Sequence, residues 1–147
     1  MKSAIINTAA SAVVSEHSWG RLVWHASQAL GNSEALTIGR CEINPGCENP
    51  SHYHPNCEEI LVVLSGTIIH SIAGEPDVMM ASSDCITIPA GVAHNARNVG
   101  QDRAILSIAF SSADRKTVPV QMTGVAGSRT RHRRPPAVHT KATPDTR

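Results

Sequence analysis

The feature that most restricts the fold is a series of short apolar runs between residues 19 and 110, each ended by Gly, Pro, Asn or Asp. No segment in this region keeps apolar residues at the spacing of a helix face, so the runs are predicted to be strands. Short strands at this spacing are typical of a β-sandwich or β-barrel. We therefore expect an all-β domain with strands at Trp19–Ser27, Ala35–Ile43, Glu58–Leu64, Thr67–Ala73, Val78–Ala81, Cys85–Ile88, Ala93–Asn98 and Ala104–Phe110.

The segments that flank these strands divide the 147-residue chain into three parts. Residues 1–18 are interpreted as an N-terminal arm, and residues 19–127 as a single barrel domain, in which Val118–Ala126 forms either a last strand or an ordered arm. Residues 128–147 are rich in Arg, Thr and Pro and have almost no large apolar side chains. Such a segment cannot bury enough surface to offset its ordering entropy, so a disordered basic tail is predicted.

Charge and cysteine usage exclude several classes of protein. The net charge is +1, because a basic tail balances a mildly acidic domain, and this argues against a nucleic-acid surface along the whole chain. A nucleic-acid role for the tail is the less favoured alternative. No apolar run is long enough for a membrane span. The four cysteines form no C-x-x-C pair and follow no clear secretion signal, which favours a reducing, cytoplasmic location.

Three histidines and one glutamate have a spacing that suits a metal site. His52 and His54 are one residue apart, so on a strand both imidazoles lie on one face. Glu59 follows five residues later, and His94 follows a Pro-Ala-Gly turn. A mixed shell of imidazole and carboxylate suits Fe(II), Mn(II), Ni(II), Co(II) or Zn(II), with one or two positions left for water or substrate.

The same residues carry a resemblance to the cupin superfamily, in particular to small single-domain cupins. Two segments match its two motifs: Gly46-x5-His52-x-His54-x4-Glu59-x6-Gly66 and Pro89-x-Gly91-x2-His94-x3-Asn98. One departure is Ser83, which stands where the second motif usually begins with Gly. The resemblance implies a conical antiparallel β-barrel (a double-stranded β-helix, or jelly roll) with His52, His54, Glu59 and His94 as metal ligands.

Some positions leave alternatives open. Glu58 fits a shorter motif spacing than Glu59, although Glu59 also satisfies the distance to Gly66. His70 is the candidate catalytic residue, as an acid or base beside the metal, and the alternative is an ordinary hydrogen-bonded histidine of the barrel. Arg40 could clamp a substrate carboxylate, but the favoured interpretation exposes Arg40 and Glu42 at the rim. His17, His25, His132 and His139 are interpreted as surface or tail residues.

The expected function is that of a metalloenzyme. We favour a dioxygenase-type, Fe(II)-dependent reaction on a small organic molecule, because such a shell can bind O2 and substrate together. A Lewis-acid isomerase, lyase or decarboxylase is the alternative within the enzymes, and a non-catalytic ligand-binding cupin is the alternative outside them. A homodimer is expected, since the N-terminal arm with Trp19 and Trp24 offers apolar surface to a partner.

Overall fold

The computed structural model describes residues 3–120 and is all-β apart from one short 3-10 helix, η1 (Ala9–Ser11). The barrel prediction is confirmed for this range, and the predictions for residues 121–147 lie outside it. Within the described residues no helix is long and apolar enough to cross a membrane. The strands are β1 (Val13–His17), β2 (Gly20–Ala26), β3 (Thr37–Ile43), β4 (His52–Tyr53), β5 (Glu59–Ser65), β6 (Thr67–Ile72), β7 (Val78–Ala81), β8 (Cys85–Ile88), β9 (His94–Asn98), β10 (Ala104–Phe110) and β11 (Val118–Pro119).

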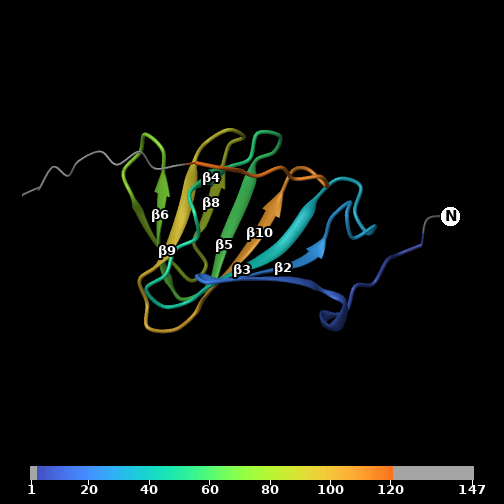
Figure 1. Ribbon diagram of the computed structural model, residues 1–147, viewed down its shortest axis with the longest axis horizontal. Coiled ribbons are helices and arrows are strands. Elements are labelled where there is room, and N and C mark those ends of the chain that lie inside the picture. The colour runs from blue at the N-terminus through green and yellow to red at the C-terminus, as the bar shows by residue number, and fades with distance from the viewer. Residues whose placement is uncertain (1–2, 121–147) are drawn as a thin grey trace, which may run out of the picture.

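The strands form two antiparallel sheets (Figure 1). One sheet has six strands in the order β1-β2-β3-β10-β5-β8, and the other has five in the order β11-β4-β9-β6-β7. Several neighbouring strands are far apart in the sequence, as for β3 beside β10 and β4 beside β9. The strand order therefore brings the two histidine-bearing segments together.

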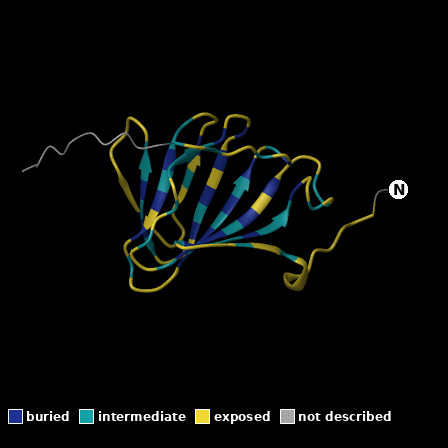
Figure 2. Ribbon diagram, viewed as in Figure 1, coloured by how far each residue is buried: buried dark blue, intermediate teal, exposed yellow. Residues whose placement is uncertain are grey.

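The apolar core lies between the two sheets. Burial alternates along the central strands, so β10 and β5 show buried and more exposed residues in turn (Figure 2). This is the period-two pattern of strands that turn one face to a core. The buried cluster comprises Cys41, Ile43, Cys57, Leu61, Val63, Ile68, Met80, Ala96, Ala104, Leu106, Ile108 and Phe110.

The eight strands expected from the apolar runs are all present; three have the expected bounds, and the ends of the others are shifted by at most two residues. The sequence did not reveal β1, which lies inside the expected N-terminal arm and pairs with β2 as an edge strand. Val13 and Val14 are both exposed, so β1 lacks the alternation by which buried strands are recognised. β11 pairs with β4, which shows the beginning of Val118–Ala126 to be a strand.

A buried carboxylate joins three arginines on the outer face of the six-stranded sheet. Glu42 is 3% exposed and accepts hydrogen bonds from Arg21 Nε (2.7 Å), Arg40 Nε (2.8 Å) and Arg103 Nη1 (3.2 Å). Burial opposes ionisation, but these arginines hold the pKa of Glu42 below its ordinary value. The prediction that Glu42 is exposed is therefore wrong. Arg40 is engaged here, away from the cavity between the sheets, and does not act as a substrate clamp.

Ser83 adopts the left-handed backbone conformation that the motif normally gives to glycine. Its φ is +80°, and it is the one non-glycine residue with positive φ among residues 3–120. Its N–H donates to Val63 O at 2.8 Å, which fixes the turn between β7 and β8 against β5. The departure from the motif thus leaves the turn in place, at the cost of a Cβ in a strained conformation.

We predict that Ser83→Gly stabilises the protein by about 0.5–1 kcal/mol, because glycine has no Cβ to strain at this φ. The measurement is urea unfolding of both proteins followed by tryptophan fluorescence. Ser83→Ala is the control, since it removes the hydroxyl but keeps the Cβ, and it should give no gain. Equal stability of the Gly and Ala variants would contradict the strain argument.

Candidate metal centre

The two sheets together supply the four candidate ligands. His52 of β4 and His94 of β9 are direct register partners in the five-stranded sheet. His54 follows β4 by one residue. Glu59 is the first residue of β5, in the six-stranded sheet. The site therefore exists only where the two sheets face each other.

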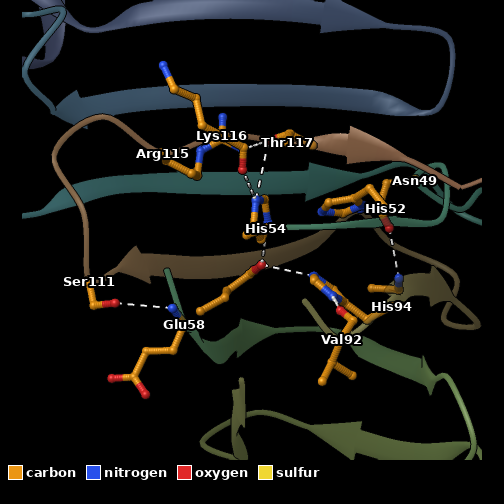
Figure 3. Close-up of polar contacts among 12 residues, drawn as sticks. Asn49, His52, His54, Glu58, Val92, His94, Ser111, Arg115, Lys116 and Thr117 are labelled. Carbon is orange, nitrogen blue, oxygen red and sulfur yellow. Dashed lines mark hydrogen bonds and ion pairs between the residues drawn. The ribbon is translucent and has the colours of Figure 1, made fainter. Parts of the chain in front are cut away.

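The ligand atoms of these four residues converge on one point. One ring nitrogen from each histidine and one oxygen of Glu59 all lie within 4.8 Å of one another. The Oε2 atom of Glu59 is 3.1 Å from His54 Nε2 and 3.0 Å from His94 Nε2. Figure 3 shows the three imidazoles turned toward this point. His54, Glu59 and His94 are buried, whereas His52 is half-buried.

Backbone carbonyls fix the orientation of all three rings. The Nδ1 atoms of His52, His54 and His94 lie 2.8, 2.7 and 2.9 Å from the carbonyl oxygens of Pro50, Lys116 and Val92, respectively. A carbonyl oxygen only accepts hydrogen bonds, so each Nδ1 carries the proton and donates it. In the neutral rings every Nε2 then presents a lone pair. This is the arrangement that orients metal-binding histidines in proteins.

Three nitrogen lone pairs and a carboxylate that face one another require a cation between them. Burial raises the pKa of Glu59, but the hydrogen bonds with His54 and His94 outweigh it and lower this pKa to about 2. Burial lowers the pKa of His94, and Glu59 reverses this and raises it. Without a metal, a proton must therefore take the place of the cation. The donor set, the locked tautomers and the anionic carboxylate all fit a divalent transition metal.

The four residues lie in the wall of a cavity of about 330 Å³ between the sheets. Its other walls are mostly apolar, with Leu22, Leu61, Leu106 and Ile108 among them. Cys41 also faces it, but burial, followed by the charges of Glu59 and Glu42, raises the pKa of this thiol to about 12. The Cys41 thiol therefore stays protonated and is no thiolate ligand at neutral pH.

His70 of β6 lines the same cavity and is 1% exposed. Its ring stacks on that of His94 at a centroid distance of 5.7 Å and an interplanar angle of 14°. Its Nδ1 is buried without a hydrogen-bond partner in the described range. Burial, and then the charge of His94, lowers the pKa of His70 to about 4, so the ring is neutral at pH 7. Among residues 3–120, Nδ1 therefore lacks the hydrogen bond that the alternative of an ordinary barrel histidine expects.

The structure also decides the remaining alternatives. Glu58 is exposed and points away from the imidazoles in Figure 3, which leaves Glu59 as the carboxylate at the centre. Trp19 and Trp24 line the cavity and do not form an outer apolar surface, contrary to expectation. His17 stacks on Trp19 at 4.8 Å and lines the cavity too, so its assignment as a plain surface residue is incomplete.

Sequence reasoning missed the segment that closes the cavity after β10. Arg115 and Thr117 line it, and the carbonyl of Lys116 holds His54 (Figure 3). These residues belong to no motif and lie about 60 positions from His54 along the chain. A lone arginine between strands carries no local signal, so only the fold reveals this contact.

These features define a β-barrel with a candidate metal site at the junction of two sheets. The cupin domain family matches residues 39–110. Oxalate oxidase 1 from Hordeum vulgare is 29% identical over 107 residues, which are 68% of this chain and 51% of that protein. Putative germin-like protein 3-4 from Oryza sativa subsp. japonica is 29% identical over 99 residues, 63% of this chain and 43% of that protein. The chain thus spans about half the length of these curated relatives.

Solved structures show the same architecture. Oxalate oxidase in complex with glycolate has a TM-score of 0.62 and 26% identity, over 67% of this chain and 54% of that one. The oxalate decarboxylase formate complex from Lactobacillus farciminis has a TM-score of 0.70 and 18% identity, over 76% of this chain and 34% of that one. The protein belongs to the cupin superfamily.

We predict that the His52→Ala/His94→Ala double variant loses at least nine tenths of the bound transition metal, because two of four ligands are gone. Element analysis of protein purified without chelator checks this. His25→Ala is the matched control, since His25 lies outside the cavity wall, and it should keep the wild-type metal content. Unchanged metal in the double variant would show that the ion binds elsewhere.

We also predict that the metal-free protein loses stability as the pH falls from about 6.5 toward 4. The folded-state pKa of His70 is about 4, below the unfolded value of 6.5, so unfolding takes up a proton in this window. The contribution of His70 is complete above pH 6.5, and about 2 kcal/mol of it is lost by pH 4.5. Urea unfolding at several pH values measures this. His70→Asn should show a flatter pH dependence by that amount, and an equal slope would contradict the assignment.

Proposed function

We propose that this protein is a metal-dependent oxidoreductase of the dioxygenase type that acts on a small organic acid with O2 as the oxidant. The observation that carries the proposal is the convergence of three oriented imidazoles and one carboxylate at the wall of an apolar cavity. A six-coordinate ion bound by four protein ligands keeps two positions, which suffice for O2 and a substrate donor. The 26% identity to a glycolate-bound oxalate oxidase supports an organic acid as the substrate class.

Fe(II) is the proposed ion, and Mn(II), Ni(II), Co(II) and Zn(II) are the alternatives that the same donors accept. A bound redox-active ion would supply the path for electrons from the substrate to O2. His52, His54 and His94 would hold it through Nε2, and Glu59 would offset one unit of its charge. The walls are mostly apolar, so a substrate that displaces water from the cavity would strengthen the electrostatic contacts within it.

His70 is the proposed catalytic residue outside the ligand set. It is neutral at pH 7, lines the cavity and carries a buried Nδ1 that no described residue satisfies. With a pKa of about 4 it holds a second proton poorly, so it is unsuited to storing one at neutral pH. Its proposed role is therefore to form a hydrogen bond with a substrate oxygen.

A redox-neutral reaction is the second candidate, since the same centre with Zn(II), Ni(II) or Mn(II) polarises a carbonyl or carboxylate group. Decarboxylation, isomerisation or elimination would then proceed without O2. The fold shared with the oxalate decarboxylase is compatible with this candidate. A barrel that binds metal and ligand without turnover is the third.

We predict O2 consumption by the Fe(II)-loaded protein with at least one member of a panel of small carboxylic acids that includes oxalate and glycolate. An oxygen electrode and product analysis measure the reaction for each of the five metals. The His52→Ala/His94→Ala variant should be inactive, and His25→Ala should match the wild type. Product formation without O2 would favour the redox-neutral candidate, and no turnover with any metal would favour the binding barrel.

We also propose a cytoplasmic location, supported by four cysteines that all have free thiols. The homodimer remains a prediction. Trp19 and Trp24 line the cavity, so they do not form the proposed dimer interface. We propose the outer face of the six-stranded sheet instead, where Ile38, Ile60 and Leu64 are exposed. Light scattering of the purified chain gives the oligomeric state.

A further inference from the structure

Arg115 places a guanidinium in the cavity wall. It is half-buried in the segment between β10 and β11, and no carboxylate of residues 3–120 forms an ion pair with it. Its Nη1 donates to Thr117 Oγ1, whereas its Nε is buried and has no partner within that range. A buried N–H group without an acceptor is unfavourable, so a native ligand that supplies one would be stabilised here.

Two aromatic rings fix the position of this guanidinium. The Cζ atom lies 4.5 Å from the ring centroid of Trp24 and 4.9 Å from that of Phe110. The Phe110 ring also packs edge-on against His54, at a centroid distance of 4.9 Å. Arg115 is thus held by cation–π contacts on rings that connect it to the metal centre. A preorganised planar fork of this kind suits a bidentate carboxylate.

The rest of the wall defines what else the ligand must carry. Among the described residues, Arg115 is the one Lys or Arg that lines the cavity. Most of the remaining wall residues are apolar. A cavity of about 330 Å³ also exceeds what a two-carbon acid would fill.

We propose that Arg115 binds the carboxylate of the substrate, and that the substrate is an organic acid with an apolar portion of several carbon atoms. Its carboxylate would take the free guanidinium N–H groups, its apolar portion would lie on Leu22, Leu106 and Ile108, and another donor would face the metal centre. That the bound acid is a substrate rests on the proposed function. The binding site itself stands on the contacts of Arg115.

The two tryptophans of the chain provide the readout. Trp19 and Trp24 both line the cavity, so their fluorescence reports directly on its occupancy. The metal-loaded full chain is titrated with butyrate, with acetate, and with butyramide, which has the shape of butyrate without its charge. We expect butyrate to bind at least tenfold more tightly than butyramide, through the charge-assisted hydrogen bonds. We expect it also to bind about tenfold more tightly than acetate, since it has two additional methylene groups.

Variants separate Arg115 from the metal. Arg115→Met should bring butyrate and butyramide to within about twofold of each other, while its metal content stays at the wild-type level. Arg115→Lys should retain part of the preference for butyrate, because it keeps the positive charge and loses the planar guanidinium. If the Arg115→Met variant does not fold, Arg115→Lys is used for the test instead. Arg97→Met is the matched control, since Arg97 is exposed outside the cavity, and it should preserve the wild-type ratio.

Two results would overturn the inference: no preference for butyrate over butyramide in the wild type, or an unchanged preference in metal-loaded Arg115→Met. The latter would assign carboxylate binding to the metal. The His52→Ala/His94→Ala variant provides the converse test, because a preference that belongs to Arg115 persists without the ion. Absence of turnover with a persistent Arg115-dependent preference would refute the proposed function and leave this site standing.

Discussion

The organising constraint of this protein is the repulsion among three imidazole lone pairs and a carboxylate that the backbone holds face to face. Pro50, Lys116 and Val92 each accept the Nδ1 proton of one histidine, so the rings present their Nε2 atoms inward. Only a cation satisfies these atoms together. Because Glu59 belongs to one sheet and His52 and His94 to the other, a bound ion also joins the two sheets, and its binding energy contributes to folding.

The cavity that adjoins this centre has a consistent chemical division. The candidate ligand atoms and His70 make one part of the wall polar, the guanidinium of Arg115 marks another, and the Phe110 ring contacts both Arg115 and His54. Mostly apolar surroundings strengthen charge interactions at both polar parts. The same residues that close the core between the sheets therefore also determine which ligands the cavity accepts.

The strands could be predicted from the sequence because burial on one face imposes a period of two that is visible along the chain, as in β5 and β10. Edge elements escape this rule. β1 exposes Val13 and Val14 and was interpreted as part of an arm. Glu42 escapes it too, because a carboxylate on an outer face becomes buried when Arg21, Arg40 and Arg103 cover it. Arg21 lies in β2, Arg40 in β3, and Arg103 immediately before β10.

The sequence by itself determined which four side chains form the centre. His52 and His54 share a face because they are two residues apart on an extended chain, and the carbonyls that orient His52 and His94 belong to residues two positions earlier. These contacts follow from the backbone geometry of residues two positions apart. Tertiary structure decided that Lys116 orients His54, that Trp24 faces inward and that Arg115 stacks over it in the cavity wall. The Lys116–His54 and Arg115–Trp24 contacts join residues 62 and 91 positions apart, and such contacts depend on strand pairing and not on sequence spacing.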